Sequence, residues 1–243
     1  MKTLTVLLLA MLAPVSFSQT QSVRDLSPSD CPISVKGTVS FSGAQGGRVP
    51  ASIVAHNRSS KEVLALVATV DMTRPNGEPI PYVLEHEYFF REDHVTGAGA
   101  DFEIASGHFD VPVVVSEYVR TPDGKKFPGL KYPPPHPPEV KLVFVQFEDG
   151  SSWGDEKAGQ AMIAERPTVM AYLKKLLSAS DESGDVGVTS VLKWEPSEKT
   201  SPSLRAIRHV LQQTKDQAGT QFLVDLVRQK IIAAEARQAK LMS

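Results

Sequence analysis

The sequence is poor in cysteine: Cys31 is the single cysteine among 243 residues. One cysteine cannot form an intramolecular disulfide, so burial of apolar side chains must hold the fold together. No run of small residues directly precedes Cys31, which argues against the lipid attachment that a lipoprotein signal directs. Two interpretations remain open, a disulfide-linked dimer and a small buried hydrophobic residue before the first strand, and we favour the second.

The sequence also lacks an excess of charge of either sign. Its 26 basic and 28 acidic residues leave a formal net charge of -2. A nearly neutral chain has no strong field to attract nucleic acid or an anionic lipid surface. We therefore predict no nucleic-acid partner and, once the leader described below is removed, no membrane association.

Catalytic motifs are a third absence. The chain has no HExxH zinc motif and no Gly-x-Ser-x-Gly elbow, and Glu92, Asp93, Asp149 and Asp155 stand where turns or helix caps use carboxylates. Hydrolysis needs a nucleophile beside a base, or two carboxylates at a fixed separation. The sequence thus predicts a protein that is not an enzyme and uses no cofactor. An exported hydrolase or metal-dependent enzyme is the alternative.

One apolar run is present, at the start of the chain. Lys2 precedes an apolar core of about ten residues, Leu4 to Ala13, which Pro14 interrupts, and small side chains follow up to Ser18. These are the parts of a secretory signal peptide. Residues 1–18 are therefore predicted to be removed by cleavage near Ser18, and the mature protein to be exported, either to the periplasm or out of the cell.

Residues 32–154 combine alternating apolar side chains with turns rich in Gly, Asn, Asp and Pro. Such alternation is typical of half-buried strands, and an apolar run on both faces is typical of a central strand covered on both sides. Val63–Met72 has this second pattern in its first half. The expected strands are Ile33–Phe41, Ser52–Ala55, Val63–Met72, Tyr82–Phe90, Phe102–Ile104, Phe109–Arg120 and Val140–Glu148.

The turn after the second expected strand begins with Asn57-Arg58-Ser59, which matches an N-glycosylation sequon. Asparagine and serine side chains also hydrogen-bond the backbone of their own turns. This turn role accounts for Asn57 without a glycan.

From Asp155 onward the apolar periodicity changes from two to about 3.6, which predicts helices. Asp155 is positioned to cap a first helix, Pro167 to open a second, and Pro202 to open a third that Gly219 breaks. The helix after Gly219 has an apolar stripe that could pair with a second copy, although packing back on the chain is favoured. The stripe comprises Leu223, Val227, Ile231, Ala234 and Leu241.

Between the second and third helices, residues 181–187 are expected to form a loop and Val188–Glu195 a short strand that holds Trp194. The whole pattern predicts a mainly β protein with an α-helical C-terminal region: an immunoglobulin-like antiparallel β-sandwich followed by about three to four helices. The expected boundaries are a signal peptide at 1–18, a leader at 19–31, the sandwich at 32–154 and the helical region at 155–243.

Two segments resemble known exported families. In Ser52–Val70 a strand ends in Asn and small polar residues and then restarts, as in immunoglobulin-like domains of the FxLYD and late-embryogenesis types, although the FxLYD string itself is absent. Val143–Asp155, with its Asp-Gly turn and Trp-Gly pair, is similar to the closing hairpin of exported bacterial proteins. The resemblance implies a scaffold or binding role without a catalytic group.

A weak candidate for a metal site comprises His86, His94 and His108, because imidazole groups bind zinc when three or four ligands converge. Strand alternation, however, predicts that Glu85 and Glu87 point to the face opposite His86. We therefore predict no metal and retain the three histidines as the centre of the enzyme alternative.

The candidate binding residues are aromatic. Trp153, beside Tyr132 and Phe147, could stack on a sugar or a peptide, although a plug between the sandwich and the first helix is the favoured role for Trp153. The stiff segment Pro133–Pro138 is either a polyproline rod that a partner recognises or a rigid connector at a sheet edge.

The sequence as a whole predicts an exported, non-catalytic binding or structural module whose partner is another protein or a peptide. Besides the enzyme alternative, a third class remains open. This is an inhibitor or chaperone-like protein that captures an extended peptide by backbone pairing at a sheet edge.

Overall fold

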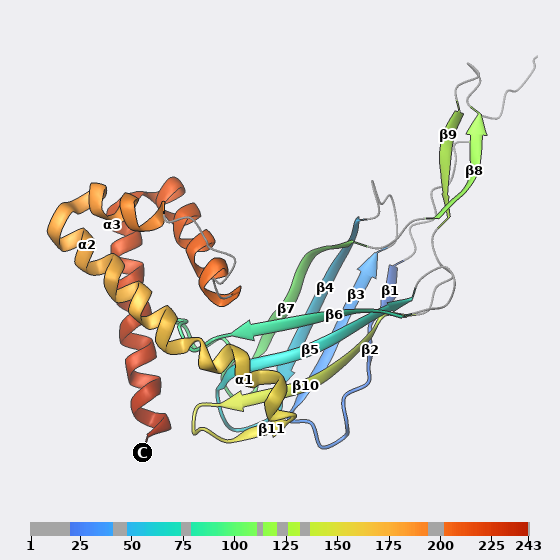
Figure 1. The fold of residues 1–243 in the computed structure, drawn as a ribbon. Coiled ribbons are helices and arrows are strands. Elements are labelled where there is room, and N and C mark those ends of the chain that lie inside the picture. The colour runs from blue at the N-terminus through green and yellow to red at the C-terminus, as the bar shows by residue number, and fades with distance from the viewer. Residues whose placement is uncertain are drawn as a thin grey trace, which may run out of the picture.

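The computed structural model describes residues 20–40, 48–73, 79–110, 114–120, 126–131, 137–193 and 202–242. A β-rich region is followed by a helical region at one end of it (Figure 1). This confirms the predicted mainly β fold with an α-helical C-terminal region. The predicted signal peptide at 1–18 lies outside the described residues.

Two sheets make up the body of the β region. The first has the order β1-β3-β4-β7, formed by Thr20–Ser22, Ile33–Ser40, Arg48–Asn57 and Asp101–Asp110. The second has the order β11-β10-β5-β6, formed by Ser152–Gly154, Glu139–Phe147, Val63–Thr73 and Pro79–Glu87, with β2 (Arg24–Asp25) parallel to β10. A separate hairpin of β8 (Val114–Arg120) and β9 (Lys126–Lys131) projects away from the body in Figure 1.

The segment 19–31, expected to be a leader outside the sandwich, contributes a strand to each sheet. β1 pairs with β3, and β2 pairs with β10. The two carboxylate oxygens of Asp25 accept hydrogen bonds from the Ser27 and Val35 backbone N–H groups, each at 2.8 Å. The side chains of these short strands are mostly exposed, so apolar periodicity could not reveal them.

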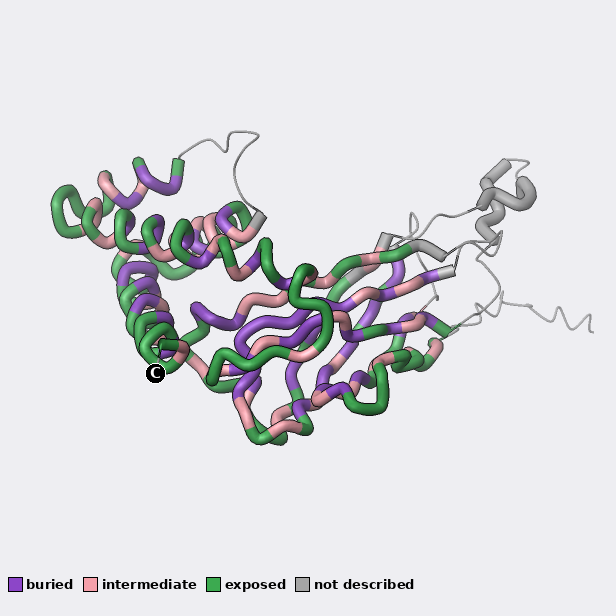
Figure 2. Tube along the Cα trace, turned by 60° about the horizontal axis from the view of Figure 1, so that its bottom comes forward, coloured by how far each residue is buried: buried purple, intermediate pink, exposed green. Residues whose placement is uncertain are grey.

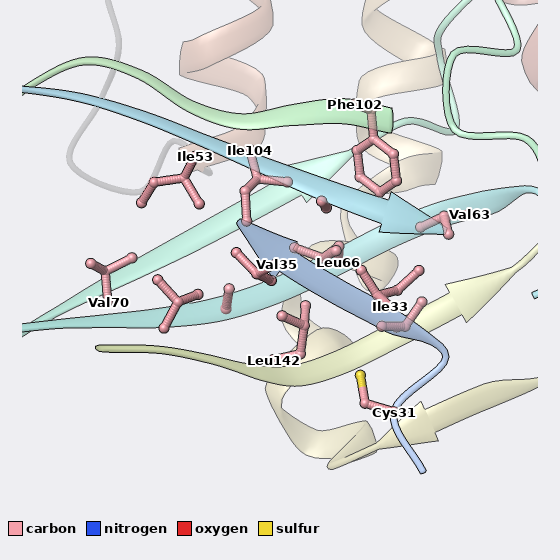
Figure 3. Close-up of a cluster of buried hydrophobic side chains, with 14 of the residues drawn as sticks. Cys31, Ile33, Val35, Ile53, Val63, Leu66, Val70, Phe102, Ile104 and Leu142 are labelled. Atoms are coloured by element: carbon pink, nitrogen blue, oxygen red, sulfur yellow. The ribbon is translucent and has the colours of Figure 1, made fainter. Parts of the chain in front are cut away.

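The main core lies between the two sheets, where buried residues gather (Figure 2) and inward-facing side chains of both sheets meet (Figure 3). Alternation places Ile33, Val35 and Val39 of β3 in this core, as predicted. Cys31 is 2% exposed at the end of the same cluster, and its burial raises the pKa of the thiol to about 11. It is a free, buried residue, as the favoured interpretation predicts.

Strand β5 is covered on both faces, which confirms the prediction from its sequence. Leu66, Ala68 and Val70 face the other sheet, whereas Ala65 and Val67 pack against the helix that follows β11. A register shift between β5 and β10 leaves Leu64 between paired positions, and its side chain packs with the helical region instead. β5 therefore connects the two hydrophobic parts of the molecule.

The helical region contains α1 (Glu156–Ala164), α2 (Arg166–Leu192) and α3 (Pro202–Leu241). The Asp155 side chain accepts a hydrogen bond from the Lys157 N–H, which confirms the predicted cap of α1. α3 is broken at Gly219 (φ 86°, ψ 171°), which confirms the predicted break. The stripe after this break packs within the chain, because Leu223, Val227, Ile231 and Ala234 lie in one buried cluster with residues of α2 and with Phe89 and Phe90.

The expected loop at 181–187 and strand at 188–195 are wrong as far as residue 192, because α2 continues to Leu192. The helix breaks only at Gly184 (φ 56°, ψ -135°). Val188, Val191 and Leu192 are buried on one face against the rest of the helical region. The two valines are β-branched and favour a strand, but the spacing of three and four residues from Val188 to Val191 and Leu192 matches a helix face. Trp194 lies outside the described residues.

Several other strand boundaries differ from the expected ones, and β4 is longer than the expected Ser52–Ala55 at both ends. β6 ends at Glu87, since Phe89 and Phe90 leave the sheet and are buried among the helices. The expected short strand Phe102–Ile104 is part of the longer β7, which continues through Gly107 (φ 121°). The expected strand Phe109–Arg120 is divided between β7 and β8, with residues 111–113 outside the described part.

Gly159 allows α1 to lie close to the sheet. A Cβ atom at this position would overlap the ring of Phe144, which is 1% exposed and cannot swing away. We expect Gly159→Ala to destabilise the protein by about 1–3 kcal/mol, although alanine is favoured in an isolated helix by about 1 kcal/mol. Urea unfolding measures the change. The exposed neighbour Gln160→Ala is the control, and equal stability of both variants would contradict close packing.

Candidate functional site

The helical region is joined to the β region by a buried ion pair. Arg237 of α3 is 4% exposed, and its Nη2 lies 2.7 Å from Oε1 of Glu62, the residue before β5. The same guanidinium donates to the carbonyl oxygens of Phe89, Arg91 and Asp93 in the loop after β6. One side chain from the end of the chain thus fixes both this loop and the start of β5.

A second buried pair lies at the start of α2. Arg166 donates two hydrogen bonds, each 3.0 Å long, to the two carboxylate oxygens of Glu87 at the end of β6. Its guanidinium also lies over the ring of Phe89, 4.3 Å from the centroid. The Glu87 carboxylate further accepts the Phe89 N–H at 3.0 Å. This two-point geometry holds the first residue of α2 against the end of β6.

A cavity of about 370 Å³ lies where β6, α1, α2 and α3 meet. We call it the joint cavity. Its wall is mainly apolar, but charged side chains surround it. The apolar side chains are Phe90, Met162, Val169, Ala206, Ile207 and Val210, and the charged ones are Glu85, Glu87, Arg91, Glu165, Arg166 and Lys230.

Most charged groups around the joint cavity already have partners. Besides the Arg166–Glu87 pair, Arg91 pairs with Asp93 at 2.8 Å and Lys230 with Glu92 at 2.9 Å, and Glu165 accepts the Ser203 N–H at 3.1 Å. The exposed Glu85 has no ion-pair partner among the described residues. The cavity therefore offers an apolar interior with one carboxylate at its rim that remains available to a ligand.

The rim of the cavity is also an edge of a sheet. The Tyr88 N–H donates to the Leu64 carbonyl at 2.8 Å, directly beyond the paired part of β6. Hydrogen-bonded and non-hydrogen-bonded pairs alternate along an antiparallel ladder, so the backbone groups of Val83, Glu85 and Glu87 face away from β5. Within the described ranges, no strand pairs with this outer edge of β6.

The three histidines of the weak metal candidate have separate surroundings. His86 points to the core side of β6 and stacks on Tyr88 at 5.9 Å, opposite Glu85 and Glu87 as strand alternation predicts. His94 Nδ1 lies 2.9 Å from Oε2 of Glu62. The His108 backbone pairs with Pro50, and its side chain is not described. Among the described residues, no three His, Cys, Asp or Glu side chains form a group that could hold a metal.

His86 should make stability depend on pH. Burial lowers its pKa below the ordinary value, and its Nε2 has no hydrogen-bond partner in the described part of the chain. Below pH 6.5 the unfolded chain then binds more protons than the folded chain. The free energy of unfolding should therefore decrease as the pH is lowered below 6.5, by at most about 1.4 kcal/mol per pH unit. Thermal unfolding between pH 5 and 7 should show a flatter profile for His86→Phe. The exposed-site control His209→Phe should keep the wild-type slope, and equal slopes in all three proteins would contradict this assignment.

Of the predicted aromatic platform, two residues are described. Phe147 is buried in the core between the sheets, with Lys61 Nζ 5.8 Å above its ring. Trp153 packs partly against the same core, and its Nε1–H donates to Asp30 at 3.3 Å. Tyr132 and most of the Pro133–Pro138 segment lie outside the described residues. A stacking role for Trp153, Tyr132 and Phe147 stays a prediction.

Sequence reasoning missed the joint cavity and the two ion pairs. Arg237 follows Ala234 at the spacing of the apolar stripe, and Glu62 directly precedes the apolar run of β5. Charged residues at apolar positions are rarely buried unless paired. A charged residue at a position of an apolar pattern is therefore a signal of a buried ion pair, but it does not identify which two charged residues meet.

Comparison with known proteins gives no relative for this architecture. No protein-family model matches the chain, and neither a curated protein nor a solved structure is significantly similar to it. None of the helices in the described part of the chain is long and apolar enough to cross a membrane.

Proposed function

We propose that this chain is an exported, non-catalytic binding module and that the joint cavity is its binding site. The observation that carries the proposal is the apolar cavity of about 370 Å³ at the meeting point of the β and helical regions. Ligand sites are typically apolar hollows with a few directed polar groups, often between structural units. Most of the charged groups around this one are held in pairs, which suits a rigid receptor.

The strand order supports an immunoglobulin-like scaffold for this module. In that fold, strands A, B and E share one sheet, while G, F, C and C′ share the other. The orders β3-β4-β7 and β11-β10-β5-β6 agree with these two sets in chain order. The β8–β9 hairpin would then be an insertion between strands E and F. Immunoglobulin-like scaffolds serve many unrelated binding functions, so the site must specify the ligand.

Export is the second part of the proposal. It rests on the apolar leader at 1–18 and agrees with a fold whose one cysteine is buried and free. Secretion into the medium or periplasm of an expression host, followed by determination of the mature N-terminus, tests it. Cleavage after Ser18 is the expected result, and retention of the full-length chain in the cytoplasm would contradict it.

A cavity-filling variant tests the binding site. Ala206 lines the cavity from an exposed position of α3, so Ala206→Trp should fill it and leave the core intact. His209→Trp, exposed on the same helix and absent from the lining, is the matched control. Thermal shift assays with defined sets of sugars, amino acids, fatty acids and short peptides should yield ligands that stabilise the wild type and the control but not Ala206→Trp. Ligands that stabilise all three proteins equally would refute the joint cavity as the site.

A further inference from the structure

We infer that the ligand of this module is an extended peptide that adds as a strand to the outer edge of β6 and inserts an apolar side chain into the joint cavity. This inference rests on the proposed function, because it uses the same cavity. It goes further by assigning the class of ligand, the part of the β6 edge that it binds and the side chains that it must carry.

The backbone of β6 supplies the first half of the recognition. The N–H and C=O groups of Val83, Glu85 and Glu87 face away from β5, and no described strand pairs with them. A row of such groups is a template for one more strand. Pro81 occupies the next outward-facing position and has no N–H group, so the available edge is the second half of β6. This half is the part that lies beside the cavity.

The side chains of β6 supply the second half. Residues two apart share a face of a strand, and Glu85 and Glu87 both line the joint cavity. The side chains of an added strand would follow the same alternation, so every second peptide residue would project toward the cavity side. One of them would meet the wall of Phe90, Val169 and Ile207, which requires an apolar side chain.

The charge at the rim specifies the neighbouring peptide residue. Arg91, Arg166 and Lys230 are neutralised by Asp93, Glu87 and Glu92 respectively. Glu85 and Glu165 remain without a basic partner among the described residues, which leaves the rim acidic. Charge complementarity therefore favours a peptide with Lys or Arg two residues from the apolar anchor. An acidic peptide would be repelled at the same place.

The experiment uses the full mature chain and a displayed library of random nine-residue peptides. Selected peptides should carry an apolar residue and a Lys or Arg two positions apart. Synthetic copies are then N-methylated at one backbone position at a time. We expect a period of two: methylation at residues that pair with β6 weakens binding about tenfold or more, because each removes a hydrogen bond, and methylation between them has little effect.

Two variants of β6 complete the test. Val83→Pro removes one outward N–H without breaking the ladder to β5 and should weaken peptide binding by about tenfold. Val83→Thr keeps the N–H and the β-branched shape, so it separates the loss of the N–H from the loss of the valine side chain and should bind about tenfold more tightly than Val83→Pro. Circular dichroism and thermal unfolding establish that both variants are folded before binding is compared.

The possible failures are distinguishable. A library that yields no binder, acidic selected peptides, or N-methylation effects without a period of two would each overturn the strand-addition inference. In the last two cases, loss of binding in Ala206→Trp would still support the joint cavity as the site. Peptides that bind Ala206→Trp as tightly as the wild type would overturn the proposed site as well.

Discussion

Arg237→Met is expected to destabilise the protein by about 3–5 kcal/mol, because it leaves the buried Glu62 carboxylate without its counter-charge. Three backbone carbonyls in the loop after β6 lose their donor in the same step. Methionine fills much of the same space, so the loss reflects charge and hydrogen bonding more than a cavity. Urea unfolding monitored by tryptophan fluorescence and by circular dichroism measures the change.

A double substitution separates the charge from the other contacts. Glu62→Gln in the Arg237→Met background removes the unpaired charge and should recover a large part of the lost stability. Lys174→Met is the matched control, since Lys174 pairs with Glu235 at 2.7 Å but both side chains are 55% exposed. The control should change stability by about 0–1 kcal/mol. If Arg237→Met behaves like this control, the buried pair does not hold the helical region in place.

The features that the sequence predicts correctly are local ones. The cap at Asp155, the break at Gly219 and the two-sided burial of β5 depend on neighbouring residues, and all three were predicted. Local signals of this kind are encoded in spacing and turn chemistry. The edge strands β1 and β2 were missed, because backbone pairing with exposed side chains leaves no apolar pattern.

The candidate site was harder to predict, because it is made by residues far apart in the chain. The joint cavity combines Glu85 and Glu87 of β6 with Arg166 of α2 and Val210 of α3. None of these positions belongs to a motif, and the apolar ones look like ordinary helix faces. The aromatic and histidine candidates stand out by residue type alone, whereas the structure buries Phe147 in the core and places His86 against Tyr88 and His94 beside Glu62.

The loop that Arg237 holds is anchored at its other end by Asn57. This side chain is fully buried, and its Nδ2 donates to the carbonyls of Lys61, Thr96 and Gly97 at 2.7–3.0 Å. Its Oδ1 accepts hydrogen bonds from the N–H and the hydroxyl group of Ser59. In the folded protein, the amide of this sequon is therefore closed to glycosylation, and the turn role predicted for Asn57 extends to a second loop.

Asn57→Asp is accordingly expected to cost about 3–5 kcal/mol at pH 7, because it sets a carboxylate against carbonyl oxygens in a buried site. The folded state should hold the new carboxyl group protonated, with its pKa above the ordinary value. The folded chain then binds more protons than the unfolded chain above about pH 4, so stability should fall as pH rises from 4 to 7. Chemical unfolding at several pH values measures this slope.

The exposed substitution Gln160→Glu makes the same amide-to-carboxylate change on α1 and should leave both stability and its pH profile near those of the wild type. A loss of stability in Asn57→Asp that does not depend on pH would mean that the new carboxyl group accepts hydrogen bonds from a rearranged loop instead of facing the carbonyls of Thr96 and Gly97.

The loop after β6, which both Asn57 and Arg237 contact, also carries Arg91 on the wall of the joint cavity. Substitution of either Asn57 or Arg237 should therefore weaken peptide binding as well as lower the stability of the protein. If stability and peptide binding decrease together in these variants, the proposed site depends on the fold of this loop.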